Sequence, residues 1–91
     1  MDFVVEVWTS EKGFIECKLT RTKWQGKEAV YADMWQSMDF LGGSFTSFRA
    51  AVWLLWDGKK YNIVDPKGYK NANSFWIELE RQLSNTIIVN E

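Results

Sequence analysis

Histidine is absent from this 91-residue chain, which also contains only one cysteine and one proline. Without histidine, the chain cannot build a Ser-His-Asp or Cys-His catalytic group, an imidazole metal site or a histidine pH switch. The single cysteine, Cys17, excludes zinc fingers, iron–sulfur sites and an internal disulfide. No glycine-rich phosphate loop of the Walker or dinucleotide type occurs. We therefore expect no catalytic residue, no metal and no cofactor, and a protein that is not an enzyme.

Long apolar runs are also missing, since none reaches 18 residues, and the first segment, MDFVVEVW, is acidic rather than basic. These features predict neither a membrane span nor a signal peptide. The lone cysteine suits a reducing compartment. Because 46% of the residues are hydrophobic, the chain can bury a core. We expect one small globular domain over residues 1–91, located in the cytoplasm, with no membrane partner.

Alternation of apolar and polar residues predicts strands at 3–9, 14–21 and 28–36. A loop over residues 11–13, with Gly13 at positive φ, would place Ser10 opposite Phe14. This register pairs Val7 with Cys17, Val5 with Leu19 and Glu6 with Lys18. Cys17 then faces the core as a small buried residue, and in the third strand Val30, Ala32 and Met34 share that face.

The central stretch over residues 42–58, GGSFTSFRAAVWLLWDG, holds the longest apolar run and follows a connection predicted at 38–43. The spacing of Phe48, Ala51, Val52 and Leu55 is typical of a helical stripe. Ser44, Thr46 or Ser47 would cap this helix, and Gly58 would end it. Alternatively, residues 52–56 and 61–64 form a hairpin around a type I′ turn at Asp57-Gly58. The two alanines favour the helix for residues 46–56.

The last third predicts a strand at 60–64, a turn at 65–68, a helix from Asn73 or Ser74 through about Leu83, and a short strand at 86–89. Within the helix, Phe75, Leu79 and Leu83 would face the core, while Glu78, Glu80 and Arg81 face water. The order β-β-β-α-β-α-β predicts an α+β fold. Its antiparallel sheet would combine a three-stranded N-terminal meander with one or two further strands and pack against about two helices. The alternative is a curved five- or six-stranded sheet with one C-terminal helix.

Six tryptophans and three tyrosines are more than so small a domain hides comfortably. The predicted alternation places Trp8, Phe14, Tyr31 and Trp35 on the face opposite the core. Either a helix or a second copy covers them, or they bind a partner. The candidate anchors are Trp8, Tyr31, Trp35, Trp53 and Trp56. We favour a non-enzymatic protein-binding module, a small inhibitor or adaptor that acts through this aromatic surface, with a homodimer as a variant.

Basic residues cluster in two predicted turn regions, 18–27 and 59–70. If the two turns lie at one end of the sheet, their cations could neutralise phosphates while an aromatic ring stacks on a base. The residues of this alternative site are Lys18, Arg21, Lys23, Trp24, Lys27, Lys59, Lys60, Lys67, Tyr69 and Lys70. The pI near 5.4 argues against a dedicated nucleic-acid-binding domain. A sugar-binding role for the tryptophans ranks lowest, because such domains are commonly secreted.

Overall fold

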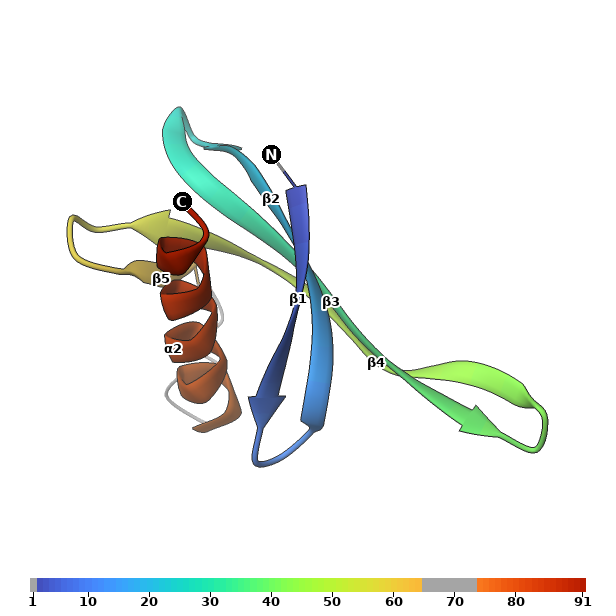
Figure 1. The fold of residues 1–91 in the computed structure, drawn as a ribbon. Helices are drawn as coiled ribbons and strands as arrows, with labels where there is room; N and C mark the ends of the chain where they lie inside the picture. The colour runs from blue at the N-terminus through green and yellow to red at the C-terminus, as the bar shows by residue number, and fades with distance from the viewer. Residues whose placement is uncertain (1, 65–73) are drawn as a thin grey trace.

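The computed structural model describes residues 2–64 and 74–91, in which an antiparallel sheet curls around one C-terminal helix (Figure 1). The strands are β1 (Asp2–Thr9), β2 (Gly13–Trp24), β3 (Lys27–Phe40), β4 (Gly43–Trp56) and β5 (Tyr61–Ile63), and the helix is α2 (Ser74–Val89). The strands pair in chain order, each with its neighbour. This is the curved sheet with one helix that the sequence allowed as an alternative. The favoured arrangement with about two helices is wrong for the described residues.

The central stretch is strand β4 rather than a helix, and it pairs with β3 along almost its whole length. As a strand, it directs Phe48, Ala50, Val52 and Leu54 toward the core. The apolar residues of this stretch do have a helical spacing, but a helix here would leave β3 without a strand to pair with on this side. The connection predicted at 38–43 is wrong for the same reason, because β3 continues to Phe40 and only Leu41 and Gly42 form the turn.

The first hairpin has its predicted glycine but not its predicted register. Gly13 adopts a φ of 74°, as expected for the end of this loop. Val7 pairs with Ile15 rather than Cys17, and Glu6 pairs with Glu16 rather than Lys18. The Thr9 hydroxyl accepts a hydrogen bond from the Lys12 N–H at 3.1 Å, which closes the loop one residue earlier. Since the slip is two residues, every side chain keeps its predicted face.

The core lies between the inner face of the sheet and one side of α2. The sheet contributes Val7, Ile15, Cys17, Leu19, Val30, Ala32, Met34 and Leu54, and the helix contributes Phe75, Leu79, Leu83 and Ile87, all of them buried. The predicted burial of Cys17 and the inward stripe of the helix are confirmed. The strand expected at 86–89 is wrong, because Ile87 continues the helical stripe by one more turn. Asn73 and the turn predicted at 65–68 lie outside the described residues.

Helix α2 also hydrogen-bonds to both outer strands of the sheet. On one flank, the Gln82 amide donates to the Trp8 carbonyl and accepts the Trp8 N–H, and Glu78 accepts the Ser10 N–H at 3.1 Å. On the other flank, Ser84 accepts the Tyr61 N–H at 2.9 Å and Glu80 accepts the Ile63 N–H at 2.7 Å. The helix therefore closes the curl by bridging the end of β1 and β5, and it occupies the edge of β5 and the Trp8 end of β1, where another strand could otherwise pair.

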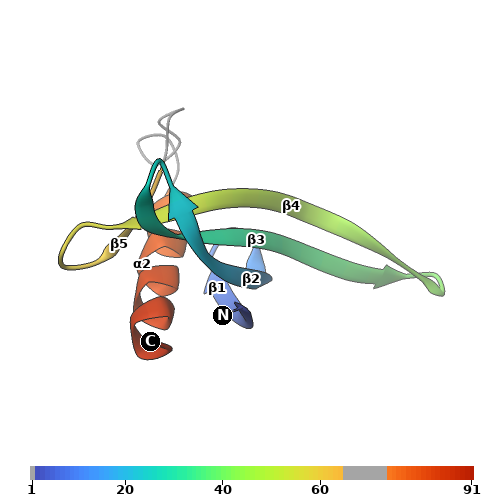
Figure 2. The same cartoon turned by 90° about the horizontal axis from the view of Figure 1, so that it is seen from above.

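Beyond the curled body, the far ends of β3 and β4 project as a two-stranded arm (Figure 2). Strand β2 pairs with β3 only as far as Trp35, and β5 pairs with β4 only over Leu54–Trp56. Past a β-bulge between Gln36 and Ser37, β3 and β4 pair with each other alone within the part of the chain that the structure describes. We call residues 37–47 the β3–β4 arm.

Candidate binding surface

The face of the sheet that points away from α2, here called the outer face, carries a group of aromatic side chains. Strand alternation directs Trp8, Phe14, Tyr31, Trp35 and Trp53 to this face. Among residues 2–64 and 74–91, no second layer packs over it. Trp8 is 47% exposed and Phe14 is 65% exposed. A covering helix, one of the explanations considered from the sequence, is therefore not found in the described structure.

The aromatic residues of the outer face form cross-strand pairs. Trp8 lies directly opposite Phe14, at the end of the sheet near the first hairpin loop. Tyr31 lies opposite Trp53, with ring centroids 4.8 Å apart and planes tilted by 55°. Such pairs stabilise the sheet and also keep the rings in fixed positions. A rigid aromatic surface loses little conformational entropy when it binds a partner.

In the middle of the outer face, two cations are paired with acids, whereas Lys27 at the start of β3 is exposed. Arg49 bonds Asp33 at 3.0 Å, and Lys18 lies 3.9 Å from Asp2. By contrast, Glu6 lies directly opposite Glu16, and two like charges in this position destabilise a sheet. Neither glutamate forms an ion pair with a described residue. The part of the outer face around Phe14 and Trp35 therefore carries excess negative charge beside its aromatic rings.

The aromatic rings and the two glutamates meet in a shallow hollow of about 320 Å³ at the base of the β3–β4 arm. It is lined by Glu6, Phe14, Glu16, Trp35, Gln36 and Ser37. The Gln36 amide donates to the Lys12 carbonyl at 2.6 Å and to the Phe14 carbonyl at 3.0 Å, which ties the first hairpin to the base of the arm. The hollow is thus held from β1, β2 and β3, and it offers aromatic walls with two carboxylates.

Four of the five aromatic anchors predicted from the sequence, Trp8, Tyr31, Trp35 and Trp53, share this face. Trp56 does not, because it lies two residues after the buried Leu54 and therefore points to the same side of β4 as Leu54. There its ring lies 5.1 Å from that of Tyr61. Phe14, which the sequence placed on this face without making it an anchor, is the most exposed member of the group. Its exposure follows from its position next to the hairpin loop.

The described parts of the two basic regions contain the β2–β3 turn and the β4–β5 turn, and these lie at one end of the sheet, because alternate turns of a meander share an end. Four of their cations are engaged in ion pairs: Lys18 with Asp2, Arg21 with Glu91, Lys23 with Glu28 and Lys60 with Glu80. Trp24 is half-buried, whereas Lys27 and Lys59 are exposed. Lys67, Tyr69 and Lys70 lie outside the described residues. The positive charge that this end could offer to phosphates is accordingly reduced.

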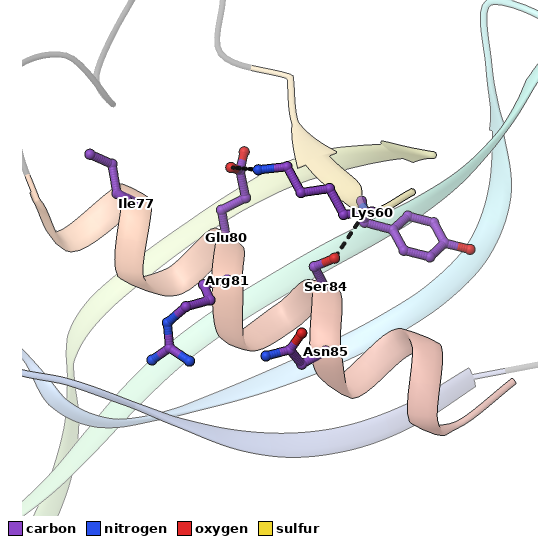
Figure 3. A pocket seen from close by; sticks show the side chains of 7 residues that line it. Lys60, Ile77, Glu80, Arg81, Ser84 and Asn85 are labelled. Carbon is purple, nitrogen blue, oxygen red and sulfur yellow. Dashed lines mark hydrogen bonds and ion pairs between the residues drawn. The ribbon is translucent and has the colours of Figure 1, made fainter. Parts of the chain in front are cut away.

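A second hollow, of about 250 Å³, lies between the β4–β5 loop and α2 (Figure 3). Its polar groups serve the fold: Ser84 accepts the Tyr61 N–H, and the Glu80 carboxylate lies 3.9 Å from the Lys60 ammonium. Glu80 was expected to face water but is buried, because it accepts the Ile63 N–H at the edge of β5. The helical spacing alone did not reveal this, since the edge of β5 comes from another part of the chain.

Among the residues that the structure describes, three side chains have shifted pKa values. Burial raises the pKa of the Cys17 thiol to about 12, so this thiol stays protonated and inert. Hydrogen bonds from the backbone of Lys60 and Lys59 and from the side chain of Asn62 lower the pKa of Asp57 to about 2. Burial is also the main cause of the raised pKa of Tyr61, whose hydroxyl donates to Glu91 at 3.0 Å. None of the three lies in the hollow on the outer face.

In the described ranges, no group of three or more acidic, cysteine or histidine side chains is arranged to hold a metal ion. The one described helix, α2, is too short and too polar to cross a membrane. Comparison with protein-family models, with curated proteins and with solved structures finds no match for this chain. The function is therefore inferred from the surface itself.

Proposed function

We propose that this chain is a non-enzymatic protein-binding module whose outer face seats a partner protein. The observation that carries the proposal is the pair Trp8 and Phe14, which lie opposite each other and are both large, apolar and exposed. Tyr31, Trp35 and Trp53 extend the same surface. Aromatic residues dominate the energetics of protein interfaces, and a rim of charge around them is typical of a partner site.

The charges on this surface favour a protein over a nucleic acid. The hollow beside Phe14 contains Glu6 and Glu16, and these carboxylates would repel phosphates. The basic end of the sheet carries several lysines that are already paired with acids. A protein surface with an apolar centre and a basic rim complements both features of the outer face. By occluding such a surface, the module would act as an inhibitor or as an adaptor.

The experiment replaces Phe14 with the photo-cross-linker p-benzoyl-L-phenylalanine in cells that produce the protein. The captured partner is then purified and titrated against the wild-type chain, a Phe14→Ser variant and an Ile77→Ser control. Ile77 is a matched control because it is also apolar and exposed, at 54%, but lies on α2. We expect Phe14→Ser to weaken binding by about 2 kcal/mol or more, as for an interface hot spot, while Ile77→Ser binds as the wild type does.

Equal affinities for all three chains would contradict the proposal. Light scattering of the purified chain at high concentration separates binding to another protein from binding to a second copy. A titration with DNA and RNA at low and physiological salt tests the alternative function. Saturable binding that weakens steeply with salt, and that is reduced by Lys27→Ala or Lys59→Ala, would favour the nucleic-acid-binding alternative instead.

A further inference from the structure

The β3–β4 arm exposes apolar side chains that lie outside the core cluster. Met38 and Phe45 lie directly opposite each other across the arm, and each is 51% exposed. Leu41, at the tip, is 91% exposed. From Ser37 to Leu41 the arm extends about 14 Å, given the rise of a strand. A two-stranded hairpin without a further layer is marginally stable in water, so these side chains would be better placed against another surface.

Leu41 is an unfavourable residue at its position for a second reason. Both residues of its two-residue turn have positive φ, 48° for Leu41 and 82° for Gly42. Such turns favour asparagine, aspartate or glycine at the first position, since a branched aliphatic side chain is strained there. The turn between β2 and β3 has the same geometry, with φ of 49° and 79°, but carries the polar Gln25 before Gly26. Leu41 thus costs local stability and exposes apolar surface, and such a residue points to a function.

The base of the arm is held firmly, so its direction is set before any partner arrives. Ser47 is the extra residue of the bulge, and its hydroxyl donates to the Gln36 carbonyl at 3.1 Å. The Gln36 side chain in turn donates to the first hairpin. A bulge typically bends a strand and re-aims the side chains beyond it. The arm is therefore a projecting element on a rigid base rather than a loose loop (Figures 1 and 2).

Charge decides what kind of surface the arm can enter. Residues 37–47, SMDFLGGSFTS, contain a single charged residue, Asp39, and no lysine or arginine. Such a segment cannot neutralise phosphates, which excludes a nucleic-acid groove as its target. The hollow of a second copy is also unsuitable, because Glu6 and Glu16 there would meet Asp39. The complementary occupant is an apolar cleft of another protein with basic residues at its rim.

We infer that the β3–β4 arm inserts its tip, led by Leu41, into an apolar cleft of the partner protein. Met38 and Phe45 contact one wall of the cleft, and a basic residue of the opposite wall meets Asp39, which alternates with Met38 and therefore points to the other face of the arm. The basic rim of the cleft meets the two glutamates at the base of the arm. This inference rests on the proposed protein-binding function, and it adds a second contact to the outer face. It also accounts for the hollow, which lies where the partner's rim would sit when the arm is inserted.

The test uses a variant that separates folding from binding. Leu41→Asn places a favoured residue at the positive φ and removes the apolar tip. As a control, Gln25→Asn introduces the same residue at the same position of the β2–β3 turn without removing an apolar side chain. A photo-cross-linker at Phe45 captures the partner, which is purified and titrated against each chain. We expect both variants to melt at or above the wild-type temperature. Leu41→Asn is expected to weaken binding about 30-fold, while Gln25→Asn leaves it unchanged.

Other outcomes would overturn the inference. Wild-type affinity of Leu41→Asn would exclude the tip as a contact, and a cross-link at Phe45 to a second copy or to nucleic acid would exclude the proposed occupant. A cross-linked partner peptide without lysine or arginine near its apolar residues would contradict the basic rim. If only the inference about the arm is wrong, Leu41→Asn binds as the wild type does while Phe14→Ser still weakens binding. If neither Phe14→Ser nor Leu41→Asn changes the affinity, the proposed function fails as well.

Discussion

Asp57 organises the loop between β4 and β5 through three hydrogen bonds to one carboxylate. Its Oδ1 accepts the N–H groups of Lys59 and Lys60, both at 2.9 Å, and its Oδ2 accepts the Asn62 side chain at 2.8 Å. The loop spans four residues between the paired Trp56 and Tyr61, in place of the two-residue turn considered for Asp57-Gly58. Each of these bonds favours the charged carboxylate, which explains its low pKa.

The stability of the protein should therefore depend on Asp57 at acid pH. Its pKa is about 2 in the folded chain, against 3.8 for an unperturbed aspartate, so the unfolded chain takes up the proton first as pH falls. The stabilisation is complete above about pH 4 and is lost between about pH 4 and pH 2. We expect the free energy of unfolding to fall more steeply over this range for the wild type than for Asp57→Asn. Urea unfolding at several pH values measures both slopes, and identical slopes would show that other carboxylates are responsible.

At the scale of the element, α2 acts both as the cover of the core and as the bridge between the sheet edges. Gln82, which bonds Trp8 in β1, and Glu78, which bonds Ser10 just after β1, are one turn apart on one flank. The residues that bond β5, Glu80 and Ser84, are one turn apart on the other flank. The buried stripe of the helix runs between these two pairs. One helix thus satisfies backbone groups that a closed barrel would satisfy with another strand pairing.

Gln82→Met should loosen the β1 edge, because methionine fills similar space but neither donates to nor accepts from Trp8. We expect a loss of about 1 kcal/mol in the free energy of unfolding, since water can partly replace the amide at this edge. Amide hydrogen exchange at Trp8 should become faster, and this readout is specific to the bridge. Arg81→Met, on an exposed position of the same helix, is the control. Unchanged exchange at Trp8 would mean that the Gln82 amide does not protect this edge.

At the scale of the whole molecule, the sheet and the helix share a single core. Cys17, in the middle of β2, and Leu79, in the middle of α2, are both completely buried in the same cluster. Within the described residues, this cluster contains side chains from both the N-terminal and the C-terminal third of the chain. Neither part can bury its apolar side without the other, so we expect them to unfold together.

Leu79→Ala tests this coupling. Truncation at a fully buried site should cost about 2–5 kcal/mol, whereas Ile77→Ala at an exposed position should change stability by less than about 0.5 kcal/mol. The helix is followed by circular dichroism and the sheet by the reaction of Cys17 with a thiol reagent. Because the Cys17 thiol is buried with a pKa of about 12, it should react only when the sheet opens. Two separate transitions would show that the sheet is stable without its helix.

Local patterns in the sequence were sufficient to predict which side chains of the first three strands face the core and which residues of the helix form its buried stripe. Cys17, Val30 and Met34 were assigned to the core from alternation alone, and the structure buries all three. The same alternation placed Trp8, Tyr31 and Trp35 together on the outer face. Such assignments succeed because a side chain's face depends only on its own strand, with a period of two residues.

What the tertiary structure decided depends on contacts between distant segments. Residues 46–56 satisfy a helical period as well as a strand period, and pairing with β3 selects the strand. Shifting the first hairpin by two residues leaves its alternation unchanged, so only the closure of the loop by Thr9 sets the register. The arm, the hollow at its base and the uncovered outer face all follow from β4 being a strand. Sequence periodicity is a local property, whereas strand pairing and the covering of a face require two parts of the chain to meet.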